Sequence, residues 1–408
     1  MKKAICLLLA ALLALPLFAS CAKGKEKVYI IKDGAPIYAI VYRDGAATNV
    51  RKRATVLEDW FNDKCENGVV KLTAVAEDGA SEEAEILIGE TGRPETEAVK
   101  KTLPEVGYAV RAVGNKIVIV GTSDALTIEA AEAFTKNCLA DEKFEKGDLA
   151  VDADLDITVP ITLDGNLYSY IRSGKSFSVS LELVCQSPAL GIYYCAQGAA
   201  SDGTYVWFVL RKKASEQDYC IITKHLLSTG EKVAESEPIY LFHGNDMAYV
   251  PEKKLLVVSH CTAPEAELVT LVDAETLTVV EQSKRLERGV CALEYSASRK
   301  LYAMSNSRNM YYFDENFKLV RETPIRWATG YTAQGMGGDD VYLYQPMSGD
   351  KDNVLVVTTW DGFNVGEVHL PIKTESETMF YVNGEYYVSF YKKKNGAELY
   401  KLSFKYDE

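Results

Sequence analysis

Between Lys27 and Val159 the apolar positions follow two different spacings. Alternation and short apolar runs predict strands at 28–31, 37–42, 86–88, 108–113 and 116–120. A spacing of three to four residues predicts helices over 48–64, around 95–101, and after Thr122 or Ser123, either of which can serve as the N-cap. The pair Asp33-Gly34 marks a turn between the first two strands, and Gly114-Asn115 marks a hairpin between the last two. We therefore expect a small α+β domain over residues 21–160.

From about Asp164 onward the helical spacing disappears, and five segments share one plan. Each has an inner-strand start, a turn, an apolar second strand, a third strand, a tight turn and a fourth strand. The second strands recur every ~40–50 residues, a period typical of one propeller blade, near Thr204, Lys254, Lys300, Asp340 and Glu385. Residues 161–408 are thus predicted to form an all-β propeller, with five blades of four antiparallel strands. Six blades remain an alternative if residues 160–195 hold further strands.

The ends of this repeat region predict how the ring closes. The fifth repeat stops at its third strand, 398–406, which would leave an unpaired edge open to aggregation. Residues 177–184 alternate apolar and polar positions and precede the first repeat. We expect strand 177–184 to pair with 398–406 and close the propeller.

The first residues read as an export signal. Lys2 and Lys3 precede an apolar run of about 15 residues, which is too short for a permanent membrane span. The run ends in Phe18-Ala19-Ser20-Cys21, which resembles the lipobox of bacterial lipoproteins, although leucine is usual where Phe18 stands. The resemblance implies that residues 1–20 are removed as a signal peptide. It also implies that Cys21 carries lipid, including a palmitate-type acyl chain, and anchors the protein on the outer side of the bacterial cell membrane. An ordinary signal peptide that ends near a cysteine is the alternative.

Composition narrows the range of partners. The formal net charge of −13 disfavours the phosphate backbone of nucleic acids. Four histidines provide little material for a metal centre, so no metal and no cofactor are expected. Seven cysteines beyond Cys6 and Cys21 show neither a disulfide framework nor zinc-site spacing, and they suit small buried hydrophobes. Cys65 and Cys138 end two predicted helices and could pair, but buried thiols are the preferred interpretation.

Two further resemblances concern the two halves of the chain. The runs 86–95 (ILIGETGRPE) and 115–121 (NKIVIVG) resemble the small α+β domain that precedes the catalytic barrel of bacterial α-glucuronidases and hexosaminidases. No barrel follows here, so this likeness implies a fold and a surface setting rather than an activity. The repeat region, with Gln197-Gly198 in one blade and 245–249 (NDMAY) in the next, resembles exported helveticin-like propellers. That likeness implies contact with a cell wall or a glycan.

The candidate site lies where the inner strands begin, because a closed ring gathers those positions at one mouth of its channel. The expected ligand-binding residues are Gln197, His243, Asn245, Asp246 and Gln334, and the same mouth receives Glu294 and Glu377. A purely structural role is the competing interpretation, since polar residues at strand starts often hydrogen-bond a neighbouring backbone. Trp327, beside Arg326, is the best aromatic candidate for stacking on a sugar ring.

These features predict a membrane-anchored extracytoplasmic binding protein that holds a glycan, a cell-wall fragment or a peptide at the propeller mouth. The first alternative is a polysaccharide hydrolase in which Asp246, Glu294 and Glu377 act as catalytic carboxylates. A scaffold for protein partners is the second alternative. The common nucleophile, phosphate-loop and metalloprotease motifs do not occur in the sequence.

Overall fold

The computed structural model describes residues 26–75, 84–139, 144–145, 147–212, 218–325, 330–393 and 395–407. The expected signal peptide, the lipid-attachment residue Cys21 and the pair Arg326-Trp327 lie outside these residues. Among the described residues, no helix has the length and apolar character needed to cross a membrane.

A six-stranded mixed sheet forms the centre of the N-terminal part. Its strand order is β10-β6-β7-β5-β3-β4, with β3, β4, β5 and β7 parallel and with β6 and β10 antiparallel to their neighbours. The strands are β3 (Ala39–Arg43), β4 (Leu72–Val75), β5 (Glu85–Ile88), β6 (Gly107–Val113), β7 (Lys116–Gly121) and β10 (Asp156–Pro160). A smaller sheet, β2-β1-β9-β8, comprises β1 (Lys27–Lys32), β2 (Ala35–Pro36), β8 (Phe144–Glu145) and β9 (Asp148–Asp152).

Helices cover both faces of the larger sheet. On β5, Ile86 and Ile88 pack into the core formed with α1 (Thr48–Lys64) and α3 (Asp124–Cys138), while Leu87 faces the core beside α2 (Pro94–Lys100). The Ser123 hydroxyl caps α3 by accepting a hydrogen bond from the Leu126 amide, as the sequence predicted. The expected turn at 33–34 joins β1 to the short β2; β1 and β3 lie in different sheets, so they do not form a hairpin.

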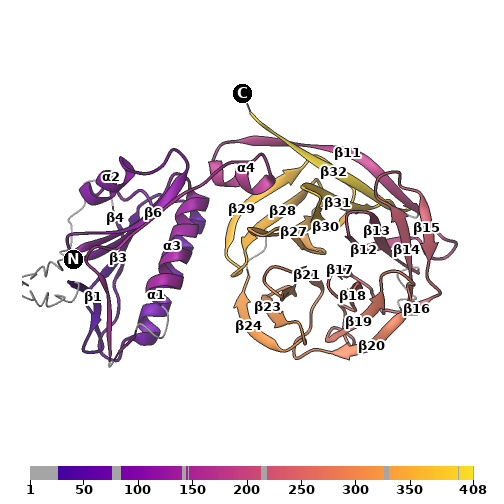
Figure 1. Ribbon diagram of the computed structural model, residues 1–408, viewed down its shortest axis with the longest axis horizontal. Coiled ribbons are helices and arrows are strands. Elements are labelled where there is room, and N and C mark those ends of the chain that lie inside the picture. The colour runs from indigo at the N-terminus through magenta and orange to yellow at the C-terminus, as the bar shows by residue number, and fades with distance from the viewer. Residues whose placement is uncertain are drawn as a thin grey trace, which may run out of the picture.

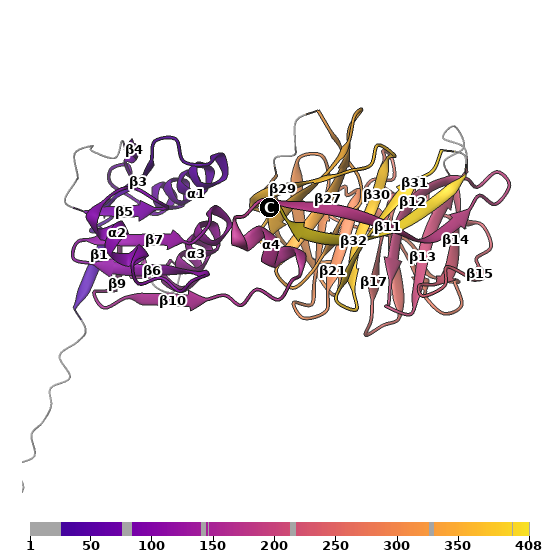
Figure 2. The same cartoon turned by 90° about the horizontal axis from the view of Figure 1, so that it is seen from above.

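The rest of the chain is a β-propeller, with sheets arranged around a central axis (Figures 1 and 2). Its strands follow one another outward from the centre in each repeat. The first two repeats contain β12 (Cys195–Ser201), β13 (Tyr205–Arg211), β14 (Tyr219–Leu226), β15 (Lys232–Glu235) and β16 (Ile239–Tyr240), then β17 (Asp246–Val250), β18 (Leu255–Ser259), β19 (Leu268–Asp273) and β20 (Val279–Arg285).

The next repeat contains β21 (Ala292–Ser296), β22 (Leu301–Ser305), β23 (Asn309–Asp314) and β24 (Leu319–Pro324). In the following one the inner strand is interrupted, since β25 (Thr332–Ala333) and β26 (Gly337–Gly338) both pair with β27 (Tyr342–Ser348), which leads to β28 (Asn353–Thr359) and β29 (Asn364–Leu370). The last repeat has β30 (Ser376–Val382), β31 (Glu385–Tyr391) and β32 (Gly396–Tyr406).

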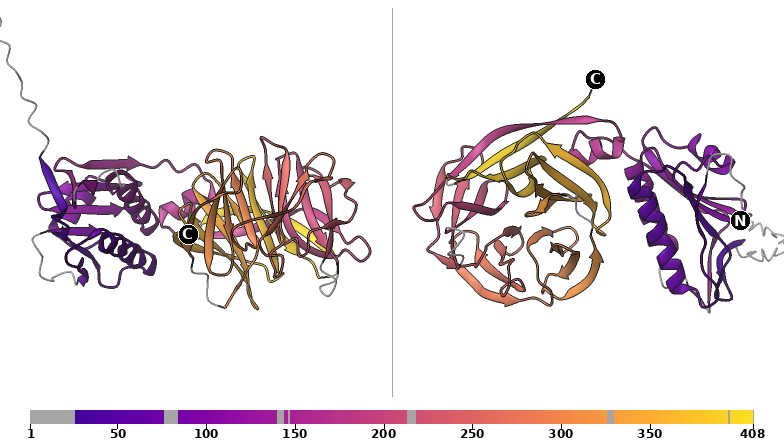
Figure 3. Two further views of the ribbon diagram at one scale, coloured as in Figure 1. Left: turned by 90° about the horizontal axis from the view of Figure 1, so that it is seen from below. Right: turned by 180° about the vertical axis from the view of Figure 1, so that it is seen from behind.

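The outermost strand of this last sheet comes from the other end of the repeat region. Strand β11 (Phe177–Pro188) runs antiparallel to β32, with Phe177 opposite Tyr406 and Pro188 opposite Gly396. Figure 3 shows the two strands crossing the outside of the ring together. Apolar side chains of β11 and β32 pack into the same cluster as those of β27 and β31. The first and last strands of the repeat region therefore share one hydrophobic core.

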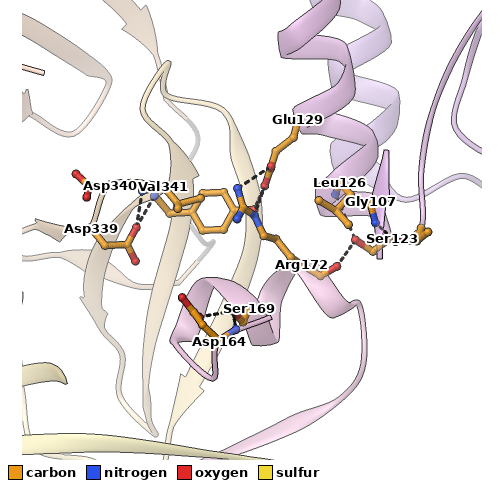
Figure 4. A network of polar contacts seen from close by, with 12 residues as sticks. Gly107, Ser123, Leu126, Glu129, Asp164, Ser169, Arg172, Asp339, Asp340 and Val341 are labelled. Carbon is orange, nitrogen blue, oxygen red and sulfur yellow. Dashed lines mark hydrogen bonds and ion pairs between the residues drawn. The ribbon is translucent and has the colours of Figure 1, made fainter. Parts of the chain in front are cut away.

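A short helix, α4 (Leu167–Ser173), connects the two parts, where we expected no helix after Asp164. Tertiary contacts explain it, because the Tyr170 ring packs on Tyr406 and the Arg172 guanidinium makes two 2.9 Å hydrogen bonds to the Glu129 carboxylate on α3. Figure 4 shows Arg172 facing Glu129. The Tyr342 hydroxyl also contacts Glu129 from the propeller. These contacts join α3, α4 and the propeller across their interface.

Candidate functional site

The buried carboxyl group of Asp246 lies at the centre of the ring. Its Oδ2 accepts hydrogen bonds from the backbone amides of Leu293 and Met336, both at 2.8 Å, and the Thr378 hydroxyl lies 2.7 Å from Oδ1. Asp246 has no exposed surface. One side chain at the start of β17 thereby contacts the inner segments of the three repeats that follow it.

Glycines make room for this arrangement. A Cβ added to Gly198 would stand 2.5 Å from the Asp246 Cα, and one added to Gly335 would stand 2.6 Å from the Asp246 Oδ1. Larger residues at these positions would separate the inner strands. The Gln-Gly and Asn-Asp-Met runs of the sequence therefore pack against one another at the axis, where Asp246 contributes to closing the ring.

Burial dominates the electrostatics of this carboxyl group. It raises the pKa of Asp246 to about 7, because removal from water disfavours the charged form more than the surrounding donors favour it. Both protonation states fit the geometry, since Oδ2 can accept the two amides while a protonated Oδ1 donates to the Thr378 hydroxyl. Asp246 thus has a structural role, with no surface left for a ligand.

His243 and Arg211 meet at the mouth where the inner strands begin. Arg211 ends β13, and its Nη1 lies 3.0 Å from the His243 Nδ1. A guanidinium group can only donate, so Nδ1 is the acceptor and a neutral His243 carries its proton on Nε2. Burial, and then the Arg211 charge, lower the pKa of His243 to about 4, so the ring is neutral at pH 7. Among the described residues its Nε2 has no hydrogen-bond partner, and the side chain is half-buried.

The three predicted amide side chains lie in different surroundings at this mouth. The Asn245 Nδ2 donates to the Cys291 carbonyl at 3.2 Å, and the half-buried Gln334 donates to the Glu375 carboxylate at 3.2 Å. Gln197 is 7% exposed, and its amide donates to the Ala196 carbonyl. Gln197 is therefore the least accessible of the three, and Gln197 and Asn245 both donate to backbone carbonyls.

Glu377 and Glu294 complete the predicted set. Burial raises the pKa of Glu377 well above its usual range, although the nearby Arg211 charge opposes this, and Glu377 is 3% exposed. Within the described part of the chain, no group hydrogen-bonds its carboxyl oxygens. Burial and then the charge of Asp246 raise the pKa of the half-buried Glu294 carboxyl well above normal. In both groups the shift is toward the neutral acid form.

Sequence reasoning missed two residues of this centre, Arg211 and Thr378. Arg211 could have been found from the sequence, because it is the charged residue at the end of the apolar run of β13. A charged residue in that position lies at the end of its strand, where its side chain can reach the mouth. No sequence signal distinguishes Thr378 from other strand threonines. The described residues contain no group of three histidine, cysteine or carboxylate side chains placed to hold a metal ion.

Comparison with solved structures gives distant likenesses. No family model matches the chain, and no curated protein matches it. A solved structure of Myxococcus xanthus glutaminyl cyclase is similar with 10% identity and a TM-score of 0.40, over 57% of this chain and 100% of that one. The RRP9 WD40 repeats align with 8% identity and a TM-score of 0.36, over 54% and 99% of the two chains. The β-propeller domain of Cps50 (Swd1) from Myceliophteria thermophila aligns with 9% identity and a TM-score of 0.31, over 52% and 65%.

Proposed function

We propose that this protein is a membrane-anchored, extracytoplasmic binding protein that holds a neutral, hydroxyl-rich ligand such as a surface glycan at the propeller mouth. In this proposal residues 21–160 form an accessory domain and residues 161–408 form a five-bladed propeller. The observation that carries the proposal is the His243 Nε2–H group, which stays without a partner among the described residues, while Arg211 on the other side of the imidazole ring also lies near Glu377.

The charge state of the mouth favours hydroxyl groups over ions. His243 is neutral at pH 7 because its pKa is lowered to about 4, and the raised pKa of Glu377 favours its neutral acid. The Nε2–H of His243 can donate to a sugar hydroxyl, while a carboxylic acid and the amide of Gln334 can both donate and accept. A rigid ring holds these groups in place, so little ordering entropy is lost on binding.

A glycan array followed by calorimetry tests this proposal. His243→Ala should weaken binding roughly 5- to 150-fold, the equivalent of about 1–3 kcal/mol for one lost hydrogen bond to a buried polar group. His369→Ala is the matched control, because His369 lies on the outer strand β29 with a side chain 66% exposed. Unchanged binding in His243→Ala, or an equal loss in the control, would refute the proposed site.

The same experiment separates the alternatives. A hydrolase would release sugar fragments, and Glu377→Gln would stop their release while retaining binding. A scaffold for protein partners would bind no glycan. Asp246 is a poor candidate for a catalytic base, because its carboxyl group already contacts three donors from the chain.

Anchoring through Cys21 needs its own test, because that residue lies outside the described part of the chain. In a bacterial host, the full chain should partition with membranes and carry a lipid-modified N-terminus by mass spectrometry. Cys21→Ser should appear in the soluble fraction. A membrane-bound Cys21→Ser protein without lipid would contradict the lipoprotein assignment.

A further inference from the structure

Two cysteines from neighbouring repeats meet beside the propeller mouth. Cys261 lies just after β18, and Cys291 lies just before β21. The Cys291 thiol donates to the Cys261 carbonyl oxygen, 3.5 Å from its Sγ, and the two thiols lie close enough for each to shift the pKa of the other. Both residues are half-buried, unlike the buried cysteines Cys185 and Cys220. Small reagents can therefore reach this pair more easily than those two thiols.

The surrounding backbone holds both cysteines in place. Cys261 has a φ of +67°, a left-handed conformation that residues with a side chain rarely adopt. The Cys291 amide donates to the Ser305 carbonyl at 2.7 Å, and the Cys291 carbonyl accepts from the Ser259 hydroxyl at 2.6 Å. The contact between the thiols is thus built into the strand ends rather than made by two mobile side chains.

The contact makes the two thiols chemically unequal. The neighbouring Cys261 thiol lowers the pKa of the Cys291 thiol and favours its thiolate. The same interaction, together with burial, raises the pKa of Cys261. Cys291 is therefore the better nucleophile, and Cys261 is placed to react second.

We propose that Cys261 and Cys291 form a redox-active dithiol that is oxidised to an intramolecular disulfide by low-molecular-weight disulfides. The Cys291 thiolate attacks one sulfur of the reagent, forms a mixed disulfide and releases one thiolate. Cys261 then loses its proton to solvent and attacks the Cys291 sulfur, which releases the second thiolate. The reagent is reduced to two thiols, and the protein loses two hydrogen atoms.

The resulting bond would link two adjacent repeats covalently beside Asn245. The Cys291 carbonyl accepts a hydrogen bond from the Asn245 side-chain amide. A change in the redox state of Cys291 would therefore affect the backbone that holds Asn245 at the mouth. The dithiol itself does not depend on the identity of any glycan ligand.

Oxidised glutathione, added to the full chain under native conditions, tests the proposal by intact mass spectrometry, thiol counting and peptide mapping. The wild type should lose two thiols and yield one linked peptide pair that contains Cys261 and Cys291. Cys261→Ser should stop at a glutathione adduct on Cys291, whereas Cys65→Ser should behave as the wild type, since Cys65 is a half-buried free thiol elsewhere. Thermal unfolding confirms that each variant is folded.

Two results would overturn the proposal. One is a wild-type protein that retains both thiols or accumulates the glutathione adduct. The other is a linked pair that involves a different cysteine in the folded wild type. Loss of the linked pair in Cys291→Ser, with Cys261 left unmodified or slow to react, would support the assigned order of attack.

Discussion

Substitution of Asp246 provides the sharpest test of how the ring is held together. In Asp246→Ala the amides of Leu293 and Met336 lose their acceptor in a fully buried place, whereas the Thr378 hydroxyl can turn toward the Met336 carbonyl, 3.5 Å away. Each buried amide left without an acceptor costs about 1–3 kcal/mol. We therefore expect the free energy of unfolding to fall by about 2–6 kcal/mol.

Asp246→Asn is the matched control, because it keeps the shape of the side chain. Its amide oxygen can occupy the Oδ2 position and accept both backbone amides, while its NH₂ group donates to the Thr378 hydroxyl oxygen. This variant should remain within ~1 kcal/mol of the wild type. Guanidinium unfolding followed by tryptophan fluorescence and circular dichroism measures the differences. If Asp246→Ala is as stable as Asp246→Asn, the carboxyl group does not hold the repeats together.

The pH dependence of stability offers a second readout for the same group. Folding raises the pKa of Asp246 from 3.8 to about 7, so the folded state binds more protons than the unfolded state between these values. Its contribution to stability is present below pH ~4 and is lost as pH rises through ~7. The wild type should therefore lose stability relative to Asp246→Asn between pH 5 and pH 8. The opposite slope would contradict the raised pKa.

Three further predictions concern other parts of the molecule. Gly335→Ala places its Cβ 2.6 Å from three atoms and should destabilise the fold by about 1–3 kcal/mol, while Gly366→Ala, which meets nothing within 4 Å, should stay near wild type in the same unfolding assay. Folding raises the pKa of Glu132 from 4.5 to about 7 through burial and the Asp361 charge, so stability should fall as pH rises across this window. Glu132→Gln should flatten that slope in thermal scans, and an unchanged slope would assign it to other groups. Arg172→Met removes both hydrogen bonds to α3, so limited proteolysis near α4 should quicken, and an unchanged rate would show that this ion pair does not hold the interface.

Local signals in the sequence predicted many elements because their causes are local. The helical spacing over 48–64 coincides with α1, and Ser123 caps α3 because its hydroxyl reaches an amide three residues away. The four-strand repeat was likewise readable, because each second strand is a short apolar run, and these strands are buried on both faces. Helix α4 escaped detection because its contacts with Glu129 and Tyr406 come from distant parts of the chain.

In the candidate site, too, some features were predicted from the sequence and others depend on tertiary contacts. Residue type and position at inner-strand starts drew attention to His243, Gln334, Glu377 and Asp246, and all four lie near the start of their repeats. The sequence alone did not reveal that Asp246 is fully buried and contacts Leu293, Met336 and Thr378, while His243 leaves its Nε2–H without a partner among the described residues.

The sequence by itself determined the strand and helix periods and pointed to polar residues at the starts of the inner strands, because periodicity and turn chemistry act over a few residues. Only the tertiary structure decided which polar groups are used internally and which remain for a ligand. It also brought Cys261 and Cys291 into contact, since they belong to different repeats. The physical reason is that burial and hydrogen-bond satisfaction depend on neighbours that are distant in the chain, and these neighbours are assembled only when the ring closes.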